Sequence, residues 1–439
     1  MGDPDSGIGP RRLTVVDGLR DSAATSQSEV PSNLPARRLR LLWVNHFAVT
    51  SADGGGTRHF EFARELCRNG WEVTIAASDF NFQSRVYTRR ESASSRETIV
   101  EDIDGVRFEW HWAAPYATND WRRGWNWLTF ARSVTSRQRE RHFDIVIGSS
   151  PHLLAAYCAS RLAKRRQIPF VFEVRDLWPE SLIAAGGRKG VVYHSLALLA
   201  AHLYRAAKQI VVLAAGSREY LVASGIDPER IDVIPNGVAT DASPTSRPEA
   251  SQRPFTLVYT GAHGPANGLH IVLEAARLVT DMPKVRFVLV GDGPAKPDLV
   301  RTSELWGLRN VEFRKPVSKA EIPVLLSEAD AALMILRDAE LFSFGVSPNK
   351  LGDYMAAGLP IICNVRGEVA ATLAESGAGV QTSDASAEGL ARAVRLLASM
   401  PASERQNLGN SGRLWVRRER SIQMLAKRLN KLLRSLINA

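Results

Sequence analysis

The chain has 439 residues, of which 45% are hydrophobic and 23% are charged, and its formal net charge is +10. That length suits two or three globular domains. The sequence contains no run of about 18 apolar residues, so no transmembrane helix is predicted. A basic chain suits nucleic acid, anionic lipid or phosphorylated small molecules, but no helix-turn-helix, zinc-finger or RNA-binding signature is present. We therefore expect no nucleic-acid partner.

Residues 1–36 are rich in Ser, Asp, Pro and Gly and have little periodicity, which predicts a disordered leader. They carry no basic region followed by an apolar one, so a secretory signal is not predicted. The three cysteines, Cys67, Cys158 and Cys363, are far apart and odd in number. This pattern favours reduced thiols in a cytoplasmic protein over disulfides or a metal site.

From residue 39 the pattern becomes that of a βαβ unit: a strand over 39–44, a loop, a helix over 57–69 and a strand over 72–76. Gly54, Gly55 and Gly56 in that loop would let a ligand approach the backbone closely, although a simple tight turn is the alternative. The loop is neither the Gly-x-Gly-x-x-Gly fingerprint of dinucleotide-binding proteins nor a Walker A sequence.

Further strands are predicted over 143–148, 170–174 and 210–213. The loops at 53–57, 148–152 and 175–180 should face one crevice, because ligands of open α/β sheets bind beyond the carboxyl ends of the strands. In the last loop Arg175, Asp176 and Glu180 are charges that are costly to bury unless paired or used, so a structural Arg175–Asp176 pair is the alternative to a functional role. His152 is a further candidate for contact with a ligand, together with His46, although a lone histidine is more often structural.

Residues 108–130 combine several aromatic residues with Arg122 and Arg123, a mixture that suits a membrane interface if part of it is exposed. Just before them, Asp102 and Asp104 imitate an Asp-x-Asp metal motif. They precede a glycine and a strand, so we interpret them as a turn between strands and predict no metal site.

The βαβ plan returns in the second half, with a strand over 256–260, a loop at 261–264, a helix over 269–279 and a strand over 286–290. Two such units predict two doubly wound domains, at 37–235 and 255–412, joined by a linker at 236–254. The tail, 413–439, is predicted to be an amphipathic helix whose basic face is either solvated or in contact with anionic lipid.

Residues 345–362 carry the most informative motif, a loop followed by a short helix and a buried strand. Ser347 is predicted as the N-cap, with the following proline at the first helical position. A helix N-terminus suits a phosphate, Lys350 adds a positive charge, and Asp353 on the same face could accept hydrogen bonds from ribose hydroxyls. A capped surface helix without a ligand is the alternative.

The motif Ser-Pro-Asn-Lys-Leu-Gly-Asp-Tyr-Met-Ala-Ala-Gly resembles the donor-binding motif of glycosyltransferase family 4, in a branch of amino-sugar transferases (N-acetyl-fucosamine-type) of bacterial O-antigen and capsule assembly. Arg-Asp-Leu-Trp-Pro-Glu at 175–180 also matches that branch. The chain departs from the commonest family pattern, because Asp353 replaces the second of two glutamates and Gly345 stands at the position of the first.

The resemblance implies the GT-B fold, an α/β fold of two Rossmann-like domains with a cleft between them and a C-terminal helix that returns to the first domain. It implies transfer of a sugar, an amino sugar on this branch, from a nucleoside diphosphate donor such as a UDP-sugar, with retention of configuration and without a cofactor or metal. The acceptor would be lipid-linked or another glycan, and the protein would be cytoplasmic and peripheral at the inner face of the plasma membrane.

Residues that match the family's site are implied as follows. Gly54, Gly55, Gly56 and Arg175 would face the acceptor or a phosphate, and Asp176, Glu180 and His152 are the catalytic candidates. The residues implied in donor binding are Gly261, His263, Gly264, Asn267, Arg337, Ser347, Asn349, Lys350 and Asp353. A nucleotide-sugar epimerase of the same fold and a non-catalytic partner of a glycan-assembly complex stay open as alternatives.

Overall fold

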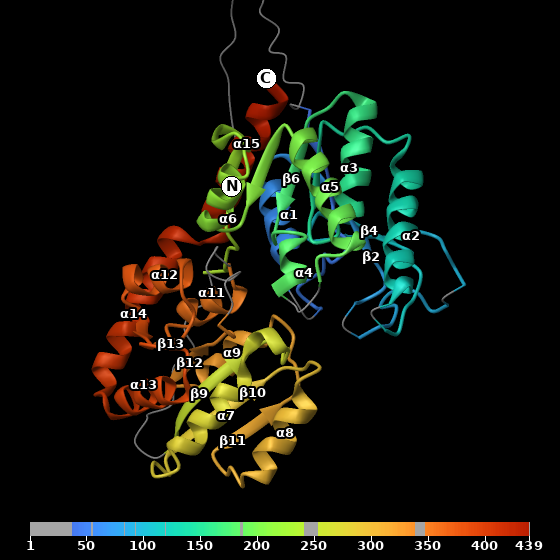
Figure 1. Cartoon of the computed structure of the whole chain (residues 1–439). Helices are drawn as coiled ribbons and strands as arrows, with labels where there is room; N and C mark the ends of the chain where they lie inside the picture. The colour runs from blue at the N-terminus through green and yellow to red at the C-terminus, as the bar shows by residue number, and fades with distance from the viewer. Residues whose placement is uncertain are drawn as a thin grey trace, which may run out of the picture. The chain divides into compact units, whose positions relative to one another are not determined.

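The computed structural model describes residues 37–438 except 54, 55, 83, 93, 119, 185–187, 241–252 and 339–346. Within these residues the chain forms two α/β sheets, one before and one after residues 241–252 (Figure 1). The predicted leader, Gly54, Gly55 and Gly345 lie outside the described residues.

The first sheet has eight strands in the order β3-β4-β2-β1-β5-β6-β7-β8, and all neighbours are parallel except the β3–β4 hairpin. This order reverses beside β1, as in a doubly wound fold. Its strands are β1 (Leu39–Val44), β2 (Trp71–Ser78), β3 (Ile99–Ile103), β4 (Val106–His111), β5 (Ile145–Ser149), β6 (Phe170–Val174), β7 (Gln209–Val212) and β8 (Ile231–Val233).

Helices cover both faces of this sheet, which is why its central strands are hydrophobic along their whole length. In β1, Leu42 and Val44 pack into one core and Leu41 and Trp43 into the other. The first core is closed by α2 (Trp121–Gln138), α3 (Leu153–Arg166) and α5 (Val191–Ala206), and the second by α1 (Arg58–Arg68). Two shorter helices, α4 (Glu180–Ala184) and α6 (Ala215–Ala223), complete this half.

The second sheet has six strands, all parallel, in the order β11-β10-β9-β12-β13-β14. The strands are β9 (Phe255–Thr260), β10 (Val285–Val290), β11 (Val311–Arg314), β12 (Ala331–Met334), β13 (Ile361–Cys363) and β14 (Gly379–Gln381). One face is packed by α7 (Leu269–Leu278), α8 (Lys296–Leu305) and α13 (Ala387–Ser399). The other is packed by α9 (Ile322–Ser327), α11 (Asn349–Ala356), α12 (Glu368–Ser376) and α14 (Ala402–Glu419).

The last helix, α15 (Ile422–Asn438), returns to the first sheet, as expected. Ile422, Leu425, Leu429, Leu433 and Leu436 are buried in the same core as α1, and a fully buried leucine contributes about 2 kcal/mol. Leu432, next to Leu433, is only partly buried. The tail was predicted to be one helix over 413–439, but residue 413 lies inside α14, whose C-terminal turn packs on the second sheet. The helix that returns to the first sheet begins at Ile422.

Most predicted elements are present with ends shifted by one or two residues. Asp104 and Gly105 form the turn between β3 and β4, as predicted, and the Gly105 N–H donates to Asp102 Oδ1. Cys67, Cys158 and Cys363 are free thiols. Among the described residues, no helix combines the length and the apolar character that crossing a bilayer requires.

Candidate functional site

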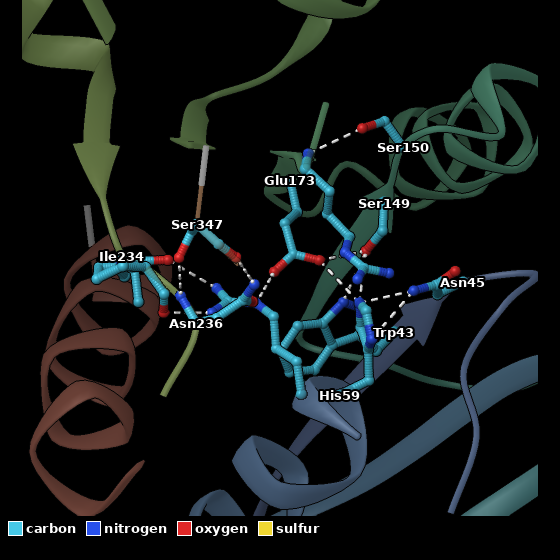
Figure 2. A network of polar contacts seen from close by, with 12 residues as sticks. Trp43, Asn45, His59, Ser149, Ser150, Glu173, Ile234, Asn236 and Ser347 are labelled. Atoms are coloured by element: carbon cyan, nitrogen blue, oxygen red, sulfur yellow. Dashed lines mark hydrogen bonds and ion pairs between the residues drawn. The ribbon is translucent and has the colours of Figure 1, made fainter. Parts of the chain in front are cut away.

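A buried carboxylate lies at the carboxyl end of the first sheet and organises the polar groups around it (Figure 2). Glu173, in β6, accepts hydrogen bonds at one oxygen from Arg58 Nε (2.9 Å) and at the other from Ser149 Oγ (2.6 Å) and His59 Nε2 (2.9 Å). Ser149 Oγ in turn accepts from Trp43 Nε1 at 3.0 Å. The Arg58 and Glu173 side chains are only 1% and 2% exposed, so the ion pair is shielded from water.

These contacts set the charge of each group. Burial alone would raise the pKa of Glu173, but Arg58, His59 and Arg175 outweigh it and hold that pKa well below its usual range. Burial lowers the pKa of His59 to about 4, although the negative charge of Glu173 acts to raise it. A neutral His59 donates from Nε2 to the carboxylate, and its Nδ1 lies 3.0 Å from Asn45 Nδ2. The result is an ionised Glu173 paired with a charged Arg58.

The same arginine reaches the segment that leaves the first domain. Arg58 donates to the carbonyl oxygens of Ile234 (2.9 Å) and Pro235 (2.5 Å). The next residue, Asn236, donates from its backbone N–H to Ser347 Oγ (3.0 Å) and from Nδ2 to the Ser347 carbonyl (2.6 Å). One chain of contacts therefore runs from β6 through α1 and residues 234–236 to the start of α11.

The predicted cap of α11 is wrong by one residue. Pro348 occupies the N-cap position without a side-chain hydrogen bond, and the helix begins at Asn349. The Ser347 hydroxyl is engaged by the Asn236 N–H instead of by a helix N–H. A hydroxyl that accepts from a distant segment cannot be recognised from the local sequence.

The loop after β6 holds Arg175, Asp176 and Glu180. Ser150 Oγ accepts from the backbone N–H of Arg175 (2.8 Å) and Asp176 (3.3 Å), so the loops after β5 and β6 meet, as predicted. Asp176 is exposed, and no ion pair joins it to Arg175 in the described part of the chain. Glu180 begins α4 and accepts a hydrogen bond from Tyr220 Oη at 2.8 Å.

Gly56 brings two predicted groups together. A Cβ built at this glycine would lie 3.0 Å from Asn349 Nδ2 and 3.7 Å from an Arg175 guanidinium nitrogen. Among the described residues, the buried Arg175 Nε has no hydrogen-bond partner. Gly56, the loop after β6 and the start of α11 are therefore neighbours, and one donor of Arg175 is unused within the described part of the chain.

His152 has a structural contact. Its Nδ1 accepts from the Ala155 N–H at 2.7 Å and caps α3, and its ring stacks on His46 with centroids 4.8 Å apart. Burial and the neighbouring His46 hold the pKa of His152 well below its usual range. His152 is therefore a neutral, fully buried ring in this structure, and its catalytic role stays a prediction.

In the second half, Gly261, Asn267 and Lys350 come together. Lys350 Nζ lies 2.8 Å from Tyr259 Oη and 3.3 Å from Asn267 Oδ1, and it sits 4.1 Å from the centre of the Tyr259 ring. Gly261 has φ +139°, and a Cβ there would lie 3.4 Å from Lys350 Nζ. No carboxylate among the described residues pairs with this ammonium, and burial lowers its pKa to about 7.

The other predicted donor residues surround this lysine less directly. Gly264 begins the 3-10 turn Pro265–Asn267, and the Arg337 N–H donates to the Ala266 carbonyl at 2.9 Å. His263 is fully buried, with a pKa lowered to about 4 by burial, so a contact of this loop with phosphate would come from its backbone. Asn349, which lies near Gly56, directly precedes Lys350 in the chain. The residues around Lys350 therefore adjoin the residues around Gly56.

Asp353 contacts a residue that the sequence did not suggest. Its carboxylate pairs with Lys319 Nζ at 2.5 Å. Both side chains line a cavity of about 510 Å³, together with apolar residues such as Ile322 and Leu326. A ribose hydroxyl at Asp353 would therefore also meet Lys319.

Glu173, Arg58 and Lys319 are the polar residues that the sequence interpretation missed. The sequence did contain a pattern that could have identified Glu173, because it is a carboxylate within an otherwise apolar strand and a buried carboxylate needs partners. No local pattern could have identified Arg58 or Lys319, because their partners are distant in the sequence. In the described part of the chain, no group of three or more His, Cys, Asp or Glu residues could hold a metal ion.

Two family models match the chain in succession. The model described as "Glycosyl transferase 4-like domain" matches residues 53–237, and the model described as "Glycosyl transferases group 1" matches residues 254–400. The chain carries both of these glycosyl transferase domains. The residues around Glu173 lie in the 4-like domain, and Lys350 and Asp353 lie in the group 1 domain.

Curated relatives match over about half of the chain. "Probable glycosyltransferase WbjE" of Pseudomonas aeruginosa is 27% identical over 266 residues, which are 57% of this chain and 65% of that protein. WcaI of Escherichia coli (strain K12), whose name assigns it to colanic acid biosynthesis, is 25% identical over 235 residues, 50% of this chain and 57% of that protein. The match therefore spans less than two thirds of the length of either relative.

Solved structures establish the fold. Sucrose-phosphate synthase from Thermosynechococcus elongatus aligns with a TM-score of 0.70 at 16% identity, covering 91% of this chain and 100% of that one. Anabaena HepE in complex with UDP and glucose aligns with a TM-score of 0.67 at 14% identity over the same shares. The 4-like and group 1 domains of this chain thus form the GT-B fold, as predicted.

Proposed function

We propose that this protein is a retaining glycosyltransferase that moves a sugar, an amino sugar, from a UDP-linked donor to a lipid-linked or other glycan acceptor in cell-surface polysaccharide biosynthesis. The two glycosyl transferase domains and the names of WbjE and WcaI support the reaction class and the biosynthetic role. The complexes of HepE with UDP support a nucleotide donor. The amino sugar and the retention of configuration rest on the motif at 347–358.

The observation that carries the proposal is the environment of Lys350. Among the described residues, the contacts of this partly buried ammonium are all with neutral groups, namely a phenol, an amide oxygen and the face of an aromatic ring. A desolvated cation without a counter-ion favours binding of an anion. It lies beside Gly261, where the absence of a side chain leaves room for a ligand, and at the N-terminus of α11, which carries a partial positive charge. A diphosphate fits this combination.

The chemistry follows from where negative charge develops. When the bond between the sugar and the diphosphate breaks, the departing diphosphate gains charge, and fixed positive groups beside it stabilise the transition state. Lys350 and the first N–H groups of α11 would supply this stabilisation. Asp353 would accept hydrogen bonds from ribose hydroxyls with Lys319 beside it. The acceptor would lie toward Gly56 and Arg175, with Asp176 and Glu180 as candidate acid–base groups.

Titration calorimetry tests the donor site. We expect UDP to bind the wild-type protein, Lys350→Ala to weaken binding at least roughly tenfold, and Lys350→Arg to retain most of it, because a charge-assisted contact contributes about 1.5–3 kcal/mol. The matched control is Lys284→Ala, an exposed lysine just before β10, at the amino ends of the strands, whereas Gly261 and Lys350 lie at their carboxyl ends. Absence of UDP and GDP binding to the wild type would remove the proposal.

A second titration tests Asp353. UDP and its 2′,3′-dideoxy analogue differ only in the ribose hydroxyls. Asp353→Asn should weaken binding of UDP and leave that of the dideoxy analogue unchanged, because the lost interaction involves those hydroxyls. Equal losses for both nucleotides would contradict the ribose contact. Incubation of UDP-sugars without acceptor separates the alternatives, since conversion to an epimeric UDP-sugar would favour an epimerase.

A further inference from the structure

Three neighbouring helices of the first domain share an unusual composition. Together α2, α3 and α5 contain nine arginine and lysine residues and no aspartate or glutamate. They pack side by side on the same face of the sheet, with α3 in the middle (Figure 1). Helix α1 on the other face has two glutamates among its eleven residues. The outer surface of α2, α3 and α5, here called the α2–α3–α5 face, is thus basic, and the exposed carboxylates beside it, Asp120 and Glu140, lie at the two ends of α2.

The same face exposes large apolar side chains. On α2, Trp121, Trp125 and Leu128 are 73%, 52% and 49% exposed, and their spacing places them on one side of the helix. On α5, Val191 and Leu198 are 83% and 73% exposed. Water-exposed tryptophan and aliphatic side chains gathered on one surface indicate a contact with another apolar phase or partner.

Most of the basic residues lie at the opposite end of the face from the exposed apolar ones; Arg122 and Arg123, beside Trp121 and Trp127, are the exceptions. Each of the three helices lies between parallel strands, so each begins at the carboxyl edge of the sheet, where Glu173 and Arg175 lie. The exposed apolar residues are in the N-terminal halves of α2 and α5, and α3 adds Tyr157 there. Exposed basic residues follow in the C-terminal halves: Arg132, Arg137, Arg161, Lys164, Arg165 and Arg205. An apolar band therefore lies at the end nearest the candidate site, with a basic band beyond it.

We propose that the α2–α3–α5 face docks on the surface of an anionic lipid bilayer. Tryptophan side chains prefer the headgroup region, where the ring is partly dehydrated and its N–H stays hydrogen-bonded. Arginine and lysine side chains near an anionic surface add attraction that falls off within a Debye length. A nucleic acid would not require the exposed Val191 and Leu198, and a protein partner would have to supply many carboxylates. The inference rests on the proposed function in one respect: a bilayer would present a lipid-linked acceptor close to the apolar band.

Helix α15 offers a matched comparison within the same chain. It also has no acidic residue and exposes Lys427, Arg428 and Lys431. Among the described residues, however, no large apolar side chain of α15 is as exposed as those of α2 and α5. If charge alone drew the protein to lipid, both basic surfaces would contribute equally. If the α2–α3–α5 face is the docking surface, changes on α15 should have little effect.

The experiment is co-sedimentation of the full chain with vesicles, without nucleotide or acceptor. We expect binding to vesicles of phosphatidylethanolamine and phosphatidylglycerol, weak binding to phosphatidylcholine alone, and release at high salt. The double variant Lys164→Glu with Arg165→Glu should lower the partition coefficient roughly tenfold or more, and Lys427→Glu with Lys431→Glu should leave it nearly unchanged. Trp121→Ser with Trp125→Ser should weaken binding at both low and high salt.

Three results would overturn the inference: no binding of the wild type to anionic vesicles, equal losses from the α3 and α15 charge reversals, or no loss from the tryptophan variant. All changed residues are exposed, so the variants should unfold at the same denaturant concentration as the wild type. UDP titration of each variant separates this inference from the proposed function. Vesicle binding by a protein that binds no nucleotide would refute the enzyme and leave the docking face in place.

Discussion

Replacing Glu173 by glutamine tests whether the buried ion pair stabilises the first domain. The substitution keeps the size of the side chain and removes its charge. Arg58 would then stay buried, 1% exposed, with two backbone carbonyls as its remaining partners and no counter-ion. His59 and Ser149 would donate to a neutral amide oxygen instead of a carboxylate.

The expected cost is large because the arginine cannot be rehydrated. Removing one partner of a buried ion pair typically costs about 3–5 kcal/mol, and we expect about 3 kcal/mol for Glu173→Gln since the amide keeps part of the hydrogen bonding. The folded-state pKa of Glu173 is below its unfolded value of about 4.3. The stabilisation is therefore fully present above that value and is lost as the pH falls through the folded-state pKa, so the two proteins should converge in acid.

The chain contains a matched exposed pair. Arg40 Nε and Glu72 are also 2.9 Å apart, but their side chains are 46% and 55% exposed. Glu72→Gln should cost at most about 1 kcal/mol. Urea unfolding, followed by tryptophan fluorescence at neutral pH, measures both free energies of unfolding. If Glu173→Gln cost no more than Glu72→Gln, the assignment of Glu173 as the buried anchor of this network would be refuted.

Three further predictions concern pH and backbone. UDP affinity should fall as the pH rises above about 7, because Lys350 then loses its proton, and Lys350→Arg should abolish this fall in calorimetry. The free energy of unfolding should decrease as the pH drops from about 6.5 toward 4, because unfolding lets the buried, neutral His59 and His111 take up protons, and His111→Gln should reduce the slope of denaturation midpoint against pH. Gly291→Ala should destabilise the protein by at least about 3 kcal/mol in urea unfolding, because φ there is +148° and a Cβ would overlap the carbonyl oxygen of the loop after β9. Gly124→Ala, in the first turn of α2, where a Cβ would meet no atom within 4 Å, should instead stabilise it by up to about 1 kcal/mol, and equal effects of the two glycine variants would contradict this account.

The order of strands and helices could be predicted from the sequence because it depends on local patterns. Apolar runs such as 39–44 and 170–174, separated by amphipathic segments, determine parallel strands joined by helices. The motif around Lys350 was also readable, since a proline, a lysine and a helix are close neighbours in the chain. The return of α15 followed from its apolar spacing together with the family resemblance.

The partners of the charged residues were decided only by the tertiary structure. Glu173 meets Arg58 across 115 positions of sequence, and Ser347 meets Asn236 across 111. Side-chain hydrogen bonds act over about 3 Å, so they depend on which strand ends the sheet order brings together, and a local pattern carries no information on that. The α2–α3–α5 face arises in the same way, because three separate helices become one surface only when the sheet aligns them.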